Sequence, residues 1–214
     1  MRRENKAVYI FNLAIFGLMV FGYSLSILFP QEKRLPSKGL LNLRYFTTLS
    51  NIFAGVVALI VFIYLIRNKE KTGLPPALSR LKLMSASAVM VTFLVVIAFL
   101  GPVYGFEKLY SGSSFFYHLV IPLAALIDYI FVEKMDKIPF RDTALAVVFV
   151  LIYGTFYLLN IAINGVGEWP NTNDWYGFTT WGLPATFLIF SMITLVSWII
   201  AVIMRGLHLK LKKS

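Results

Sequence analysis

Thr47 and His118 are the two side chains of this sequence whose chemistry could together cleave an ester. Each lies about one helical turn inside a long apolar segment. A histidine of near-neutral pKa can take a proton from a hydroxyl, which turns threonine into a nucleophile. By residue type, Thr47 could supply the nucleophile and His118 its base, although spacing alone does not assign these roles. Thr48 and Ser50 stand close to Thr47 and remain alternative nucleophiles.

Further polar residues follow helical spacing in the same part of the chain. Spacings of three and four residues place such side chains on one helix face, and amide N–H groups can stabilise an oxyanion. A structural role stays open for each, since intramembrane Asn often joins helices and Tyr anchors at interfaces. We expect substrate-binding or oxyanion roles for five residues: Asn51, Asn160, Asn164, Tyr157 and Arg44.

A pocket is expected where these groups meet. Polar side chains inside lipid are costly unless they contact one another or water. Pro122 follows His118 by four residues and has no N–H for the His118 carbonyl, so it predicts a kink. Three helices would bring polar groups to one depth near the outer leaflet. Thr47 and His118 should face each other across a cavity there.

Six apolar segments must position these residues. Of the 214 residues, 58% are hydrophobic and 14% are charged, which is typical of a chain dissolved mostly in lipid. Continuous apolar runs of about 20 residues predict helices rather than a barrel. We expect an all-α bundle of six transmembrane helices that forms one integral membrane domain over residues 1–214. The expected helices lie near 7–29, 43–66, 83–101, 114–132, 142–163 and 180–204.

The distribution of Lys and Arg predicts the orientation of the bundle. Fifteen of these residues lie at the termini and in the second and fourth connections, against five on the other side. Basic residues gather on the cytoplasmic side of membrane proteins. We therefore expect a cytoplasmic N-terminus and C-terminus. The net charge of +10 is explained by this pattern, so no nucleic acid partner is expected.

The polar residues at the ends of the segments carry further expectations. Asp128 lies about 15 Å deeper than His118 by helical rise. It should therefore pair with a basic residue such as Lys82 rather than orient His118. His208 stands in a basic tail and should face anionic lipid at the interface.

The connection after the fifth segment, residues 165–179, is acidic and aromatic. An aromatic belt at the membrane interface is favoured for it over a substrate lid. The residues behind this expectation are Glu168, Trp169, Pro170, Asp174, Trp175 and Tyr176.

Composition also limits cofactors and metals. The chain has no cysteine, which excludes disulfides and thiolate nucleophiles, and its two histidines make a transition-metal site improbable. We expect no metal and no cofactor. No Walker-type glycine loop or internal repeat stands out.

The motifs Arg44-Tyr45-Phe46-Thr47, Ser50-Asn51 and His118 to Pro122 through Asp128 resemble one family. This is the androgen-induced-gene and androgen-dependent TFPI-regulating protein family, with its bacterial six-helix relatives. The resemblance covers most of the chain in the order and spacing of helices, and Trp169-Pro170 loosely matches an aromatic-proline element after the fifth helix.

Family members that are enzymes are membrane threonine hydrolases of fatty acid esters of hydroxy fatty acids. The resemblance implies Thr47 as nucleophile and His118 as its base. The histidine-to-proline spacing fits the bacterial relatives better than the animal enzymes, and the connection after the fifth helix is particular to this sequence. Which ester is the substrate therefore stays open.

The leading hypothesis is an intramembrane lipid ester hydrolase in the bacterial plasma membrane. Its partners would be a membrane lipid or fatty acid ester and the bilayer, while the oligomeric state stays open. A lipid acyltransferase with the same Thr/His pair is one alternative. A lipid-binding or carrier protein without enzymatic activity is another, and a purely structural role is a third.

Overall fold

The computed structural model describes residues 3–29, 39–68, 73–135, 137–169 and 171–211. Pro170, named above, lies outside this part of the chain, as do five of the basic residues counted for the orientation: Lys33, Arg34, Lys38, Lys212 and Lys213.

The described chain is helical and contains six helical segments long and apolar enough to cross a membrane, which confirms the predicted all-α six-helix bundle. The first two spans are α1 (Arg3–Leu28) and α2 (Phe46–Arg67), and a short 3-10 helix (Gly39–Arg44) precedes α2. The last two are α8 (Ala146–Asn164), which a 3-10 helix (Phe140–Leu145) extends, and α9 (Gly182–Leu211).

The third and fourth spans are built from shorter pieces. The third joins α3 (Pro76–Val95) through a π-helical turn to α4 (Gly101–Tyr104), and α5 (Phe106–Leu109) follows. The fourth joins α6 (Gly112–Phe115) to α7 (Ile121–Ile127). It contains two π-helical turns, at Phe116–Val120 and Asp128–Val132.

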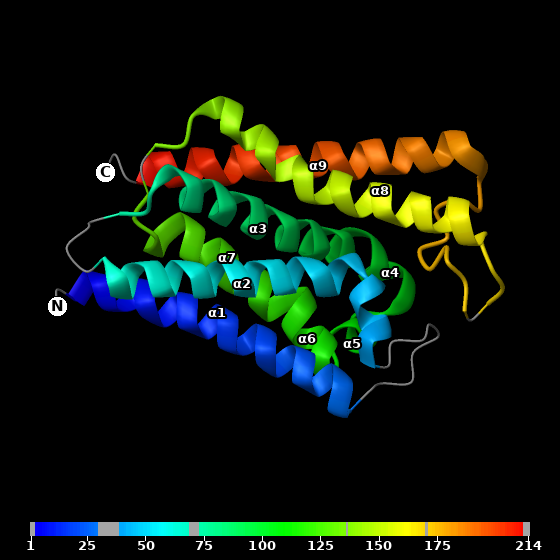
Figure 1. The fold of residues 1–214 in the computed structure, drawn as a ribbon, viewed down its shortest axis with the longest axis horizontal. Coiled ribbons are helices and arrows are strands. Elements are labelled where there is room, and N and C mark those ends of the chain that lie inside the picture. The colour runs from blue at the N-terminus through cyan, green and yellow to red at the C-terminus, as the bar shows by residue number, and fades with distance from the viewer. Residues whose placement is uncertain (1–2, 30–38, 69–72, 136, 170, 212–214) are drawn as a thin grey trace.

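Helix α3 lies at the centre of the bundle, between α2 on one side and α8 and α9 on the other (Figure 1). Its span is the most buried of the six, at 56%. The small residues Ser85 to Ala88 are all buried and let neighbouring helices approach closely. Large apolar side chains such as Val89, Ile121 and Met204 fill the remaining core.

The predicted start of the third helix was too late. We expected residue 83, but α3 begins at Pro76, where a proline suits the first helical turn. The difference places Lys82 inside the span rather than in a connection. Lys82 is 4% exposed, and its ammonium donates to Asp128, which confirms the predicted pairing of these two residues.

The predicted kink beside His118 takes the form of a π-helical turn. The N–H of Ile121 donates to the carbonyl of Phe116, five residues earlier. Pro122 comes next and has no N–H to continue an α-helical ladder. His118 lies inside this widened turn, and such turns are frequent at functional sites.

The two ends of the bundle differ in character. The first residues of α1 and the last residues of α9 lie at one end, which we call the terminus end (Figure 1). The connection 165–181 and the segments 39–45 and 105–112 lie at the other, which we call the pocket end. That the terminus end faces the cytoplasm stays a prediction from the basic residues.

The prediction for His208 was wrong. His208 is 3% exposed, and its Nδ1 donates to the carbonyl of Tyr129 at 2.9 Å. Because α9 continues as a helix to Leu211, the ring turns into the bundle rather than toward lipid headgroups. A backbone carbonyl of the π-helical turn supplies the polar contact that we assigned to lipid.

Helices α1 and α2 touch through a glycine, which allows a stability prediction. A Cβ atom at Gly55 would lie 2.7 Å from Cε and 2.8 Å from Cβ of Met19. Overpacking of this kind costs about 1 to 3 kcal/mol. We expect Gly55→Ala to lower the free energy of unfolding by that amount, as measured by thermal unfolding in detergent.

Gly17 provides the matched control, because a Cβ there would meet nothing within 4 Å. Alanine has the higher helix propensity, so Gly17→Ala should stabilise α1 by about 0.5 to 1 kcal/mol. Equal effects of the two substitutions would contradict the close approach of α1 and α2.

Candidate functional site

A cavity of about 910 Å³ opens at the pocket end of the bundle. Its walls come from the start of α2, from α4, from the π-helical turn at 116–120 and from the connection 165–181. Most of the exposed wall is apolar, and its polar groups include hydroxyls, the amide of Asn42, the carboxylate of Asp174 and the imidazole of His118. This size and character suit a lipid-like or drug-sized molecule, for which pockets of about 300 to 1,000 Å³ are usual.

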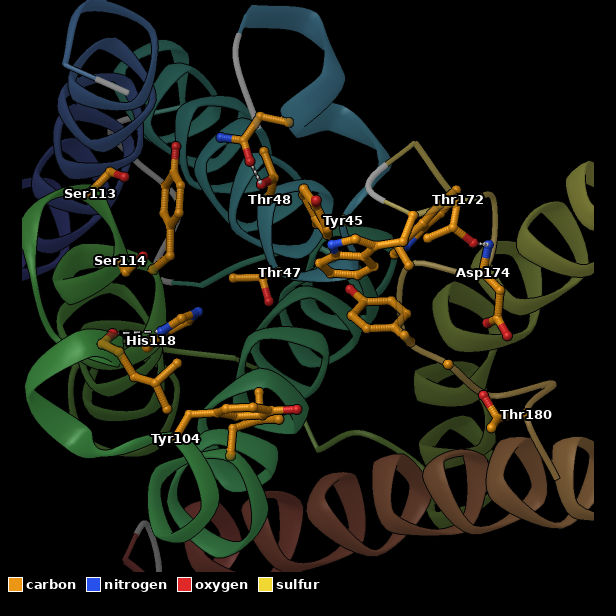
Figure 2. A pocket seen from close by; sticks show the side chains of 18 of the residues that line it. Tyr45, Thr47, Thr48, Tyr104, Ser113, Ser114, His118, Thr172, Asp174 and Thr180 are labelled. Atoms are coloured by element: carbon orange, nitrogen blue, oxygen red, sulfur yellow. Dashed lines mark hydrogen bonds between the residues drawn. The ribbon is translucent and has the colours of Figure 1, made fainter. Parts of the chain in front are cut away.

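Thr47 and His118 both line this cavity, as expected. Thr47 stands in the first turn of α2 and His118 in the π-helical turn of the fourth span. In Figure 2 the Thr47 hydroxyl and the His118 ring extend toward the same hollow from different helices. No hydrogen bond joins the two side chains in the described residues.

The hydrogen bonding of His118 determines which ring nitrogen can act as a base. Its Nδ1 lies 2.7 Å from the carbonyl oxygen of Leu109. A carbonyl can only accept, so Nδ1 carries the proton and the neutral ring has its lone pair on Nε2. The arrangement gives His118 the tautomer that a general base needs, with a backbone carbonyl as the orienting group.

Asn51 connects the two segments that carry Thr47 and His118. It is fully buried, and its Nδ2 donates to the Thr47 carbonyl at 2.7 Å and to the Tyr117 carbonyl at 3.2 Å. Both amide hydrogens are therefore used, and the side chain does not line the cavity. Asn51 is placed to hold the two segments in register rather than to donate to an oxyanion.

The alternative nucleophiles Thr48 and Ser50 are bound to other groups. The Thr48 hydroxyl lines the cavity but donates to Oδ1 of Asn42 at 3.2 Å (Figure 2). The Ser50 hydroxyl is buried, donates to the Thr47 carbonyl and lies 3.2 Å from Oγ1 of Thr92. Of the three hydroxyls, that of Thr47 fits the role of a nucleophile best.

The connection 165–181 forms part of the cavity wall. Trp175 and Trp169 both line the cavity, but Trp175 is 9% exposed whereas Trp169 is 60% exposed. The favoured belt prediction was therefore wrong for Trp175. An aromatic residue suits either a lipid interface or a protein interior, and packing against Tyr45 and Tyr157 decides the outcome here.

Asp174 holds this connection in shape. Its carboxylate accepts from the N–H of Phe178 at 2.9 Å, from the N–H of Thr179 at 3.0 Å and from the Thr179 hydroxyl at 2.5 Å. The hydroxyl of Tyr157 donates to it as well. Burial alone would raise the pKa of Asp174, but these donors outweigh it, and the pKa lies below its usual value.

Tyr157 and Arg44 support the wall of the cavity from outside. Tyr157 is 1% exposed and directs its hydroxyl to Asp174 rather than to the cavity. The Arg44 guanidinium lies over the Tyr45 ring at 5.2 Å and over the Trp175 ring at 5.3 Å. Neither residue lines the cavity. Both tie the connection 165–181 to the neighbouring helices.

Asn160 and Asn164 lie apart from the other candidates. Nδ2 of Asn164 donates to Oδ1 of Asn160 at 2.9 Å on an exposed face of α8. Neither lines the cavity, so the structure brings them together only with each other. Their spacing of four residues predicts that they share a helix face, but it does not predict what that face contacts.

Several cavity residues escaped the sequence analysis. Tyr104 comes from the end of the third span, and Ser113 and Ser114 come from the start of the fourth. The serines precede His118 by four and five residues, so helical spacing was a signal for Ser114. Nothing local marked Tyr104, because its position depends on how α4 turns.

Comparisons with known proteins identified no similar protein. No family model, no curated protein and no solved structure matches the chain.

Proposed function

We propose that this protein is an intramembrane lipid ester hydrolase in which Thr47 is the nucleophile and His118 the general base. The observation that carries the proposal is the shared, mostly apolar cavity in which both side chains lie. The hydrogen bond from His118 Nδ1 to Leu109 supports it, because it leaves Nε2 as the basic nitrogen. The family resemblance described above supports the same pair.

In the first half of the reaction, His118 Nε2 takes the proton of the Thr47 hydroxyl while Oγ1 attacks the ester carbonyl carbon. The tetrahedral intermediate then collapses and breaks the bond to the alcohol oxygen. His118 returns its proton to the departing alcohol, and the acyl group stays on Thr47 as an ester.

In the second half, a water molecule replaces the alcohol. His118 takes one proton from this water, whose oxygen attacks the acyl-Thr47 carbonyl. The bond to Oγ1 breaks, His118 returns the proton to Thr47, and a carboxylic acid leaves. An alcohol in place of water would give acyl transfer with the same residues.

Oxyanion stabilisation is assigned to the start of α2. The first N–H groups of a helix have no intrahelical partner and carry the positive end of its dipole. The Phe46 N–H donates to the Tyr176 hydroxyl at 2.9 Å. The N–H groups of Thr47 and Thr48 follow in the same turn and are the donors proposed for the oxyanion.

The proposed substrate is an acyl ester of the bilayer, with its chains against the apolar wall. We place the protein in a bacterial plasma membrane, with the bilayer and the ester as its partners and no nucleic acid. A lipid-binding or carrier protein would use the same cavity without forming a covalent intermediate. The acyl-Thr47 adduct therefore distinguishes a hydrolase from a binding protein.

The test is mass spectrometry of the folded protein after exposure to a fluorophosphonate probe or a fatty acid ester. The wild type should carry an adduct on Thr47. Both Thr47→Ala and His118→Ala should lose it, because one lacks the attacking oxygen and the other lacks the base.

Thr48→Ala is the matched control, since it removes a neighbouring hydroxyl that also lines the cavity. It should keep the adduct on Thr47. A wild type that binds lipid but forms no adduct would overturn the hydrolase in favour of a binding protein. An adduct that moves to Thr48 or Ser50 would overturn the assignment of the nucleophile.

A further inference from the structure

A second polar centre lies far from the cavity, inside the terminus end of the bundle. It consists of Lys82 on α3 together with Asp128 and Glu133 at the end of the fourth span. The three side chains are 5%, 1% and 1% exposed. Charged groups at this depth are costly and are by default functional candidates. The proposed ester chemistry uses none of them.

The charges of this centre do not balance. The Lys82 ammonium pairs with Oδ2 of Asp128 and lies 3.3 Å from Oε2 of Glu133. Among the described residues it is the one cation paired with either carboxyl group. Two ionised carboxylates would leave a net charge of −1 in a low-dielectric interior, which is strongly disfavoured.

The surrounding elements supply no second cation to these carboxyl groups in the described chain. From α1, Asn12 brings a neutral amide. From α9, the Arg205 Nε donates to the Ile138 carbonyl, and the His208 Nδ1 donates to the Tyr129 carbonyl.

Two buried acceptor atoms next to the ion pair have no hydrogen-bond donor. Asn12 is fully buried, and its Nδ2 donates to the Val8 carbonyl and to Glu133 Oε2, which fixes the direction of the amide. Its Oδ1 has no hydrogen-bond partner, nor has Oδ1 of the fully buried Asp128. Two acceptors call for a hydrogen-bond donor, such as the O–H of a protonated carboxyl group, and are incompatible with an anion.

We propose that Asp128 and Glu133 together bind one exchangeable proton, which makes the Lys82 centre electrically neutral. The proton is shared between the two carboxyl groups, as in other close carboxyl pairs. On release it passes to water, and the acid becomes a carboxylate. The centre is then a proton-binding site of capacity one that joins α1, α3 and the fourth span.

Burial determines whether the bound proton stabilises the protein at low or at high pH. Burial, the largest cause, raises the pKa of Glu133 above its ordinary value. A raised pKa in the folded state means that the folded protein holds the proton more tightly than the unfolded chain. The contribution to stability is therefore present at low pH and is lost as the pH rises through the folded-state pKa.

Infrared spectroscopy of the full chain in lipid nanodiscs tests the proposal, because a protonated carboxyl group has its own carbonyl stretch. At neutral pH the wild type should show the band of one buried acid. Glu133→Gln and Asp128→Asn should each lose it, since one carboxylate then matches Lys82. Lys82→Met should roughly double it, since both acids then stay neutral.

Asp142→Asn is the control, because Asp142 pairs with Arg80 at 2.6 Å at the same end and should not contribute. Should the variants fail to fold, the wild type alone suffices: its band and its thermal stability should fall together as the pH rises. A wild type without the band, or a band that survives in Glu133→Gln, overturns the proposal. So does stabilisation by Na⁺ without the band, which would identify a metal cation as the ligand.

Discussion

Replacing His118 by alanine is expected to lower the rate of ester hydrolysis by about 100-fold to 10,000-fold, the usual contribution of a general base. Without the Nε2 lone pair, the Thr47 hydroxyl loses the base proposed to take its proton as its oxygen attacks. Thr47→Ala should lose at least as much, because the nucleophilic oxygen is gone. The measurement is kcat/KM for a chromogenic fatty acid ester in detergent micelles.

The double variant separates a joint mechanism from two independent losses. Residues that act as one unit are strongly non-additive, so Thr47→Ala with His118→Ala should be no slower than Thr47→Ala alone. His208→Ala is the matched control, since His208 is bound to the Tyr129 carbonyl at the far end of the bundle. Equal losses in the folded His118 and His208 variants would contradict a catalytic role for His118.

Asp174→Ala is expected to cost about 3 kcal/mol of stability in the connection 165–181, because hydrogen bonds to a charged group contribute about 1.5 to 3 kcal/mol each. The substitution removes the acceptor for Phe178, Thr179 and Tyr157 at once. It also leaves the buried Tyr157 hydroxyl without its carboxylate. Hydrogen exchange should become faster in the connection while α3 stays protected.

The pH dependence of this effect has a definite sign. The pKa of Asp174 is lowered in the folded protein, so its contribution is present above the unfolded-state pKa and is lost as the pH falls through the folded-state pKa. The difference in stability between the wild type and Asp174→Asn should therefore shrink in acid. A difference that stays constant down to low pH would contradict the assigned hydrogen bonds.

The six spans could be predicted because hydropathy depends only on local composition. The start of α3 could not be predicted in the same way, because hydropathy alone treats Lys82 as the end of the apolar segment. Lys82 enters the bundle only because Asp128, 46 residues later, meets its ammonium. The neutral partner Asn12 comes from yet another helix. A contact between three distant segments leaves no mark on hydropathy.

The candidate site was predictable where it depended on residue type and on position along a helix. Thr47 and His118 were selected for their chemistry and their similar expected depth, and both line the same cavity. The role of Asn51 was not predictable, because it depends on the Tyr117 carbonyl arriving from the fourth span. The same limit applies to Asn160, whose helix face could be read from spacing but whose neighbours could not.

The fourth span carries a widened turn at each end, one around His118 and one beginning at Asp128. A π-helical turn holds one residue more than an α-turn, and an α-helix rotates by about 100° per residue. Gain or loss of a residue inside such a turn would rotate the helical segment on one side of the turn and leave the segment on the other side unchanged. A change of register at one turn therefore does not by itself rotate the residues of the other turn. In evolution each could acquire a new register without disturbing the other, so the ten-residue separation of His118 and Asp128 need not hold in homologous chains.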